Sequence, residues 1–323
     1  MNDRAPESTL AASRLPVCLQ RIKPDMLIIP GWGYPISRAA LQWAKEKNLP
    51  TVLLSESKWD DSPRSWWKEK LKSWLYTRHF KSALVGGKLH RDYLVQLGFP
   101  KKGIFLGYDI VDNDHFSCQA QQAKQFPQAS RAAHPQIPKK PFFISVTRFI
   151  PRKNVLRMIE AFVRYRQMTA SEASWDLVIC GSGEEEPNIR EKIAQHQLED
   201  FIHLPGFKTY QDIPSWFGLA NAFIHPALSE QWGLVVNEAL ASGLPALVSN
   251  RCGCFPELIQ EGRNGFGFDP ENIEALALLM LKVSQGEVDL TQMSQSAIEH
   301  IQQFSPNAFG HGFAQAVEYA LTH

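Results

Sequence analysis

Short apolar runs alternate with amphipathic stretches along most of the chain, and this alternation limits the fold more than any other feature of the sequence. In the first part the runs are Asp25–Pro30, Thr51–Leu54, Ser82–Gly86 and Gly103–Leu106. The segments between them, such as Ser37–Lys47 and His90–Leu97, have helical periodicity. Buried strands separated by helices are typical of βαβ units, so this part predicts an α/β domain with a parallel sheet.

A second series of the same kind follows a segment of different composition. Residues 119–141 are rich in Gln, Ala, Lys and Pro without a hydrophobic period, which is typical of a linker. The later predicted strands are Phe142–Val146, Leu177–Cys180, Phe201–Leu204, Ala222–His225 and Ala246–Ser249, with helices such as Asn154–Gln167 and Asn188–His196. We therefore expect two Rossmann-like, doubly wound domains, 1–130 and 131–304, facing a cleft where ligands bind at the carboxyl ends of the strands.

Composition excludes several classes of protein. The chain has 323 residues, 44% of them hydrophobic and 21% charged, which suits two globular domains. A formal net charge of +1 gives no global field that would favour nucleic acid as a partner. Five scattered cysteines, no secretory signal in MNDRAPESTL and no apolar run of membrane-spanning length predict a cytoplasmic protein.

The stretch SEQWGLVVNEALASGLPALVS, residues 229–249, predicts an anion site. Gly233 lies where a helix from about Leu234 to Ala241 should begin. The first N–H groups of a helix are unpaired and carry partial positive charge, and a glycine there lets a phosphate approach the backbone. Glu230 and Glu238 flank this point, and carboxylates accept hydrogen bonds from vicinal hydroxyls. A diphosphate with a hydroxylated group on each side, as in a nucleotide sugar, is the ligand that fits.

Two cations follow the first strand of the same predicted domain. Arg148 and Lys153 lie in a strand-to-helix turn, and cations at this edge of a sheet suit a diphosphate leaving group. Because the guanidinium and ammonium neutralise the developing charge, we expect no metal.

The motifs SVTRFIPRKN, VICGSGEEE, LPGF and SEQWGLVVNEALASGLP occur in this order. Together they resemble the second domain of retaining nucleotide-sugar glycosyltransferases of the family-4, or group 1, class, which has the GT-B fold. The resemblance is close from about Pro141 to Phe268 and covers the Glu-x7-Glu signature. It implies an α/β protein of two Rossmann-like domains that transfers a hexose with retention of anomeric configuration.

The resemblance also implies a role for each matching residue. Arg148 and Lys153 would hold the donor diphosphate, Glu230 the transferred sugar and Glu238 the ribose hydroxyls. The sugar and phosphate would also contact the backbone N–H groups of Gly233, Leu234 and Val235. The loop at 206–208 would lie near the base. Neither a metal nor a cofactor is implied; Glu230 would position the donor while the leaving phosphate acts as base.

The first predicted domain departs from the family pattern. Only a short, strand-poor segment precedes Lys23. Compared with the family's first domain, we therefore expect roughly two βα units to be absent from this sequence. Ser55–Ser57 stands where members often carry a histidine, and Gly107–Asp114 replaces an Asn-Gly-Val-Asp motif. Residues 305–323 resemble the closing segment that crosses back to the first domain. We therefore expect an incomplete first domain.

Three functions stay open on the sequence. The first is transfer of a sugar from a nucleotide sugar to a glycan or lipid-linked acceptor. The second is a non-catalytic or impaired sugar-nucleotide-binding remnant of such an enzyme. The third, an NAD(P)-dependent oxidoreductase, rests on Gly181-Ser-Gly183 but is disfavoured by three carboxylates, Glu184–Glu186, that would repel a pyrophosphate.

Three further features have structural interpretations. Asp112-Asn-Asp114 is expected to be a turn or helix cap rather than a metal site. Cys252-Gly-Cys254 has no partner pair at zinc-ligand spacing and is expected to be a loop feature. His225 is expected to be a strand-end histidine without a catalytic partner.

The segment RSWWKEKLKSWLYTRHFK, residues 64–81, has two interpretations. Trp67, Leu71, Trp74 and Leu75 fall on one helical face among several lysines and arginines. A basic, Trp-rich amphipathic helix is typical of peripheral membrane contact, here at the inner face of the membrane. The alternative is a helix that packs its apolar face on the sheet and exposes a basic face.

Overall fold

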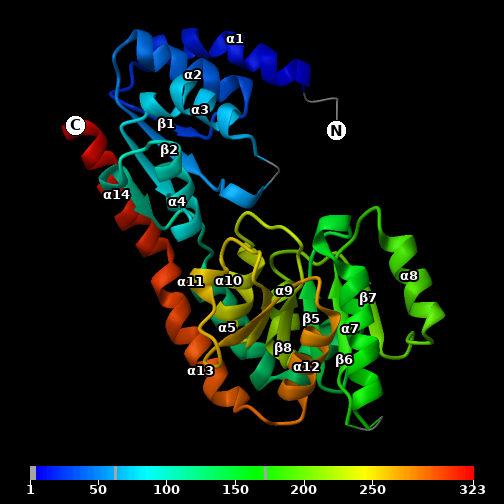
Figure 1. The fold of residues 1–323 in the computed structure, drawn as a ribbon. Coiled ribbons are helices and arrows are strands. Elements are labelled where there is room, and N and C mark those ends of the chain that lie inside the picture. The colour runs from blue at the N-terminus through cyan, green and yellow to red at the C-terminus, as the bar shows by residue number, and fades with distance from the viewer. Residues whose placement is uncertain (1–4, 62–63, 171–172) are drawn as a thin grey trace. The chain divides into compact units, whose positions relative to one another are not determined.

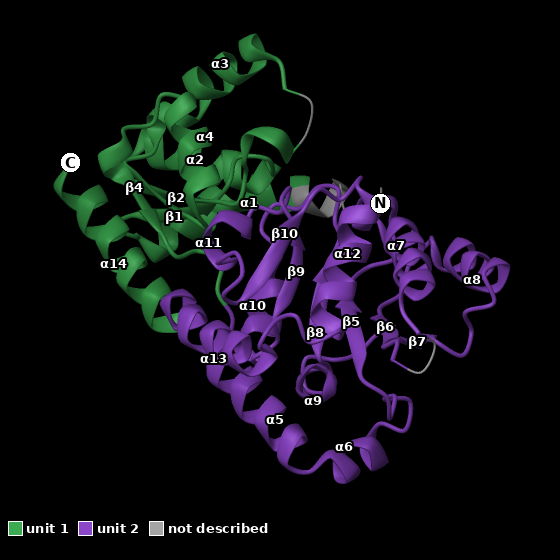
Figure 2. Cartoon of the chain, turned by 60° about the horizontal axis from the view of Figure 1, so that its bottom comes forward, with its two compact units in different colours: residues 1–110, 306–323 green, residues 111–305 purple. Residues whose placement is uncertain are grey.

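The computed structural model describes residues 5–61, 64–170 and 173–323. The chain divides into two compact units, residues 1–110 with 306–323 (unit 1) and residues 111–305 (unit 2), which Figure 2 colours separately. The division after Ile110 precedes the boundary expected at residue 130, and residues 306–323 group with unit 1. No helix among the described residues combines the length and apolarity needed to cross a bilayer.

Unit 1 contains a parallel sheet with strand order β1-β2-β3-β4. The strands are β1 (Leu27–Pro30), β2 (Thr51–Ser55), β3 (Ser82–Val85) and β4 (Ile104–Leu106). The helices are α1 (Ala5–Ile22), α2 (Pro35–Glu46), α3 (Trp66–Leu75), α4 (Lys88–Gln96) and α14 (Pro306–Thr322), and a 3-10 turn, η1, covers Trp59–Asp61 (Figure 1). All four strands predicted in this part of the chain are confirmed.

Alternate residues of the unit 1 strands enter two different cores. Val52 and Leu84 are fully buried and pack with Ala316 and Ala320 of α14. Their neighbours, including Leu53, lie in a second cluster with residues of α2 and α4. Side chains of a strand point alternately to the two faces of the sheet. A strand that is buried on both faces therefore needs a continuous apolar run.

Unit 2 contains a six-stranded parallel sheet with strand order β10-β9-β8-β5-β6-β7. The strands are β5 (Phe142–Val146), β6 (Asp176–Cys180), β7 (Ile202–Gly206), β8 (Ala222–His225), β9 (Ala246–Ser249) and β10 (Gly265–Phe268). The helices are α5 (Asn113–Gln125), α6 (Pro127–Ala133), α7 (Val155–Met168), α8 (Glu186–Gln195), α9 (Ile213–Leu219), α10 (Leu234–Ala241), α11 (Phe255–Leu258), α12 (Ile273–Ser284) and α13 (Leu290–Ile301). One buried cluster joins the sheet to α5, α9 and α10, and another joins its opposite face to α7, α8 and α12 (Figure 1).

The prediction of a linker at residues 119–141 is wrong. This segment lies within unit 2, and helices α5 and α6 occupy most of it. Ala120 and Ala123 are buried against α9, and a Cβ on Gly218 of α9 would lie 2.4 Å from the Ala120 carbonyl oxygen. Small residues let the two helices approach closely, and a contact surface made of alanines carries little hydrophobic signal in the sequence.

Candidate functional site

The unit 2 sheet has its topological switch point at β5. This strand pairs with β6 on one side and with β8 on the other. In open parallel sheets, ligands bind beyond the carboxyl ends of the strands at such a point. The loop after β5 carries Arg148 and Lys153, and the loop after β8 carries Glu230 and Gly233. The predicted site residues therefore come from the two strands that flank the switch point.

The loop after β5 is tied to its surroundings by Asn154. This residue has left-handed backbone angles, φ 60° and ψ 31°, which Asn tolerates better than most residues. Its side-chain amide donates to the carbonyl oxygens of Pro226 (3.0 Å) and Pro270 (2.8 Å). The N–H of Leu228 donates to the Arg152 carbonyl oxygen at 2.9 Å. These bonds fix the two loops on each other and bury Lys153 between them.

Glu230 is the residue on which the basic groups of this site converge. Its carboxylate accepts a hydrogen bond from the Lys153 ammonium, and the Arg152 guanidinium lies 3.5 Å away. Burial and the nearby Arg152 charge lower the pKa of Lys153 to about 8, while the Glu230 carboxylate favours the charged ammonium. Lys153, predicted to face a diphosphate together with Arg148, is thus paired with Glu230 in this structure.

His225 completes the surroundings of Glu230. Its Nε2 lies 3.6 Å from a Glu230 carboxylate oxygen, and neither ring nitrogen has a hydrogen-bond partner among the described residues. Burial, with the charges of Lys153 and Arg152, lowers the pKa of His225 to about 3. The imidazole is therefore neutral near pH 7 and is a strand-end histidine, as expected, although it touches the site.

Helix α10 begins where the sequence predicted. Gly233 is its N-cap, with φ 106°, and a Cβ there would lie 3.3 Å from Glu230 Cγ and 3.5 Å from His225 Nε2. The N–H of Val236 donates to the Gly233 carbonyl oxygen. In the described parts of the chain, no residue accepts from the N–H groups of Leu234 and Val235. Unpaired N–H groups at a helix N-terminus attract an anion.

Glu238 lies on α10 in a different environment from Glu230. Its side chain is half-buried, and its carboxylate makes no hydrogen bond or ion pair with the residues that the structure describes. Burial raises the pKa of Glu238 to about 7. Burial, together with the charges of Asp112 and Glu238, raises the pKa of Tyr210 in the loop after β7, so Glu238 lies near that phenol. A partly desolvated, unpaired carboxylate is suited to accept hydrogen bonds from ligand hydroxyls.

Arg148 differs from Lys153 in being exposed. It forms no ion pair with any residue in the described ranges, yet its charge contributes to lowering the pKa of Lys153, so the two cations are neighbours. Because its guanidinium has no carboxylate partner, it can meet an incoming phosphate without first breaking an ion pair.

The glycines after β6 have a packing role. A Cβ on Gly181 would lie 1.8 Å from the Thr147 carbonyl oxygen, and one on Gly183 would lie 2.4 Å from that of Phe149. These glycines let the loop after β6 lie directly against the loop after β5. The tight strand–helix turn, rather than a dinucleotide fingerprint, is the interpretation that this geometry supports.

The loop after β7 presents an aromatic ring at the same edge of the sheet. Gly206 aligns with Cys180 at the carboxyl end of β6, and Phe207 is 73% exposed. Lys208 lies 4.9 Å from the centre of the Trp216 ring. An exposed ring here can stack on a planar group.

Asp112-Asn-Asp114 and Cys252-Gly-Cys254 have the structural roles predicted for them, a helix cap and a loop feature. Asp112 is the N-cap of α5 and accepts from the His115 N–H at 3.0 Å. Cys252 and Cys254 are buried and form no disulfide with a described residue, and the loop between them holds Glu230, because the Gly253 N–H donates to the Glu230 carbonyl oxygen at 3.1 Å. Within the described residues no three His, Cys, Asp or Glu side chains are grouped as metal ligands; the expected metal independence stays a prediction.

Arg152 belongs to the site although no motif in the sequence indicated a role for it. It stands beside Lys153 in SVTRFIPRKN, but only the fold places its guanidinium against Glu230, 78 positions along the chain. The adjacent arginine and lysine were the signal available in the sequence.

Solved structures show the same fold. A glycosyltransferase from Rickettsia africae has a TM-score of 0.80 at 17% identity, covering 100% of this chain and 84% of that one. Anabaena HepE in complex with UDP has a TM-score of 0.78 at 16% identity, covering 95% of this chain and 81% of that one. These similarities, with two parallel-sheet units, confirm the predicted α/β fold of GT-B type.

A curated relative and a family model each match about half of the chain by sequence. The amylovoran biosynthesis glycosyltransferase AmsK of Erwinia amylovora is 31% identical over 160 residues, which is 48% of this chain and 38% of that relative. The matches thus span less than half of the length of the curated relatives. The family model described as glycosyl transferases group 1 matches residues 127–300, more than half of the chain. The chain therefore belongs to the group 1 glycosyltransferases, as its motifs indicated.

Proposed function

We propose that this protein transfers a sugar from a nucleotide-sugar donor to a glycan or lipid-linked acceptor, with retention of anomeric configuration and without a metal. One observation carries the donor site: within the described residues, no group pairs with the half-buried Glu238 carboxylate or with the first N–H groups of its helix. Leaving such groups without partners is unfavourable, and a ligand with hydroxyls next to phosphates would satisfy both.

Each residue has a role in this proposal. The diphosphate binds Arg148, Lys153 and the N–H groups at the start of α10, and Glu238 binds the ribose hydroxyls. Because Lys153 is paired with Glu230 beforehand, a phosphate that draws the ammonium away frees the Glu230 carboxylate for the hydroxyls of the sugar. Phe207 offers its ring to the base.

Retention follows if the acceptor attacks from the face that the phosphate leaves. The bond from the anomeric carbon to the phosphate oxygen breaks, the acceptor oxygen bonds to that carbon, and its proton passes to the leaving phosphate. Arg148 and Lys153 stabilise the charge that develops on the diphosphate. Glu230 then positions the sugar rather than forming a covalent intermediate.

A second candidate is a protein that binds sugar nucleotides without transferring the sugar. The observation that favours it is the enclosure of Glu230 by Lys153, Arg152 and His225. If this ion pair does not open, the carboxylate stays unavailable to the sugar. The two candidates share the donor site and differ in turnover. The group 1 family assignment, by contrast, gives no support to an NAD(P)-dependent oxidoreductase.

Calorimetric titration tests the donor site. UDP and UDP-sugars are the first ligands to try, since UDP is the ligand named with HepE, followed by the other nucleoside diphosphates. We expect one nucleotide to bind in the presence of a chelator. Glu238→Ala and Arg148→Ala should each weaken binding at least tenfold, roughly the value of one charge-assisted hydrogen bond. Matched controls are the exposed Glu199→Ala and Arg263→Ala; equal losses in these controls, or no binding by any nucleotide, would contradict the donor site.

Proton NMR of the first product tests turnover and stereochemistry. With the donor found by calorimetry, we expect the product to carry the donor's anomeric configuration before mutarotation, at a rate that a chelator leaves unchanged. An inverted product refutes the retaining mechanism. Tight donor binding with no turnover for a panel of glycan and lipid-linked acceptors favours the binding-only candidate.

Cytoplasmic location belongs to this proposal, since a nucleotide sugar is its substrate. Contact of residues 64–81 with a membrane would bring the protein to a lipid-linked acceptor, and the geometry of α3 bears on it directly.

A further inference from the structure

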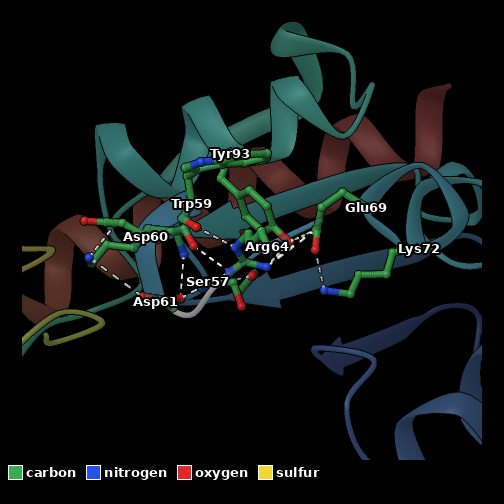
Figure 3. Close-up of polar contacts among 10 residues, drawn as sticks. Ser57, Trp59, Asp60, Asp61, Arg64, Glu69, Lys72 and Tyr93 are labelled. Atoms are coloured by element: carbon green, nitrogen blue, oxygen red, sulfur yellow. Dashed lines mark hydrogen bonds and ion pairs between the residues drawn. The ribbon is translucent and has the colours of Figure 1, made fainter. Parts of the chain in front are cut away.

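Helix α3 is attached to unit 1 by its polar side. Of its ten residues, all of them described, only Glu69 is buried. The Glu69 carboxylate accepts from the Tyr93 hydroxyl of α4 at 2.6 Å and lies 3.5 Å from the Arg64 guanidinium. Figure 3 shows these three side chains pointing toward one another. Ser73 donates its hydroxyl proton to the Leu97 carbonyl oxygen. At 3.6 residues per turn, Glu69, Lys72 and Ser73 share one side of the helix.

The anchoring carboxylate is neutralised within unit 1. Burial opposes its ionisation, but hydrogen bonds from Lys72 and Tyr93 and the Arg64 charge hold the pKa of Glu69 below its ordinary value. Arg64 also donates to the Tyr93 hydroxyl at 2.6 Å and to the Trp59 carbonyl oxygen at 2.6 Å. Glu69 therefore contributes little negative charge to the outer side of the helix.

The apolar side of α3 faces away from unit 1. Its exposed residues are Trp66 (68%), Trp67 (54%), Leu71 (48%), Trp74 (60%) and Leu75 (39%). Apolar residues on a surface helix usually face the core, so this orientation is inverted. The interpretation in which this helix packs its apolar face on the sheet and exposes a basic face is therefore wrong.

Cations lie among these exposed rings. Lys70 is 5.0 Å from the Trp66 ring centre, Lys68 is 5.4 Å from that of Trp67, and Arg78 is 5.5 Å from that of Trp74. Neither Lys68 nor Lys70 forms an ion pair with a described residue. We call these exposed apolar residues and the three cations the α3 surface.

A groove adjoins the α3 surface. It has a volume of about 600 Å³ and is walled by Trp59, Trp66 and Trp74, with Lys70 and Arg78 also lining it. Aromatic walls next to cations suit the region of a phospholipid where the phosphate meets the apolar chains.

We propose that the α3 surface docks unit 1 onto a bilayer that contains anionic phospholipids. Trp and Leu side chains insert at the level of the headgroups, and Lys68, Lys70 and Arg78 meet the phosphates. Charge complementarity selects this partner: among the described residues, no carboxylate pairs with Lys68, Lys70 or Arg78, and no part of unit 1 covers the apolar area that these cations surround. The proposal goes beyond sugar transfer, and its test needs no donor or acceptor.

Vesicle flotation tests the proposal with the full chain. We compare vesicles of phosphatidylcholine alone with vesicles of equal parts phosphatidylcholine and phosphatidylglycerol, at low and high salt. Wild type should float with the anionic vesicles at low salt and much less with the neutral ones. Lys68→Glu/Lys70→Glu should weaken binding at least tenfold, since each cation near the surface contributes about fivefold. Trp67→Ala/Leu71→Ala should weaken it by a similar factor.

Matched variants separate the α3 surface from general charge and hydrophobicity. Lys101→Glu/Lys102→Glu makes the same charge change at another exposed place in unit 1, and Tyr34→Ala removes another exposed ring, 68% accessible. Both should bind vesicles as wild type does. Because every substituted side chain is exposed, melting temperatures should stay within a few degrees of wild type, which shows that lost binding is not lost folding.

Three results overturn the proposal. The first is that wild type does not float with anionic vesicles at low salt. The second is that the control variants lose as much binding as the α3 variants. In the third, wild type is a dimer by light scattering and Trp67→Ala/Leu71→Ala is a monomer, so that a second copy rather than a lipid covers the surface. Quenching of tryptophan fluorescence by brominated lipid in wild type, and its reduction in Trp67→Ala/Leu71→Ala, would support insertion directly.

Discussion

Glu238→Gln should make the protein more stable at alkaline pH while weakening nucleotide binding. Burial raises the pKa of Glu238 from its ordinary 4.5 to about 7. Between these pH values the unfolded chain has lost the proton and the folded protein keeps it, so stability falls as pH rises. Above about pH 7 the loss of folding stability is complete, because the folded protein then holds the Glu238 carboxylate as a partly desolvated charge. Glutamine has no proton to lose and avoids this cost.

The size of the effect follows from the two pKa values. At about 1.4 kcal/mol for each pH unit that separates them, burial of the ionised Glu238 costs about 3.5 kcal/mol. Partial solvent access to the carboxylate reduces this to about 2 kcal/mol. For a unit of this size, 2 kcal/mol corresponds to about 4–8 °C in melting temperature.

Scanning calorimetry at about pH 5 and about pH 8 measures the difference. We expect Glu238→Gln to melt several degrees above wild type at the higher pH and to differ much less at the lower one. The exposed Glu199→Gln controls for the loss of a negative charge. If Glu238→Gln melts with wild type at both pH values, the carboxylate is not desolvated as described, and its assignment as an unpaired ligand-binding group loses its physical basis.

The remaining predictions concern the same site. Affinity for an intact nucleotide sugar should fall about tenfold per pH unit below about pH 7 in wild type, as Glu238 becomes protonated, whereas Glu238→Gln should bind weakly with a flat profile; calorimetry measures both. Gly233→Ala, at φ 106° and against Glu230, should cost about 1–3 kcal/mol of unfolding free energy and weaken nucleotide binding. Gly286→Ala, at φ 77° with nothing within 4 Å, should cost about 1–2 kcal/mol and leave binding unchanged; equal losses of binding would argue against a site at Gly233. Lys153→Met should destabilise the protein by about 1–3 kcal/mol in urea unfolding, because Glu230 loses its buried hydrogen-bond partner but keeps the Arg152 guanidinium nearby. Lys153→Met/Glu230→Gln should recover most of this loss; no recovery would mean that the pair is not the cause.

Hydrophobic periodicity predicted most of the two sheets, and its failures have physical reasons. Strand β10 was missed because Gly265-Phe-Gly-Phe268 has no β-branched residues. A Cβ on Gly265 would lie 2.2 Å from the Ala246 carbonyl oxygen, so glycine is needed there for close strand approach. The α5–α6 segment was taken for a linker because its buried contacts are made by small alanines.

The candidate site was predicted in its residues but not in its pairing. Gly233 and the helix that follows it are where the sequence placed them, since turn chemistry and helix starts are local. The ion pair between Lys153 and Glu230 joins loops 77 positions apart. No local pattern encodes such a contact. The ion pair distinguishes Glu230, which has a partner, from Glu238, which has none among the described residues.

Periodicity, turn residues and motifs are local features of the chain, and they predicted most of the strands and helices, the group 1 family and most of the residues at the unit 2 switch point. The pairing of charged groups and the side of a helix that faces solvent depend on contacts between distant residues, which form only in the folded protein. Residues 66–75 have the composition of an ordinary amphipathic helix. Arg64 and Tyr93 bind the one carboxylate of α3 and so turn its apolar side outward, a choice set by contacts across unit 1 rather than by the helix sequence.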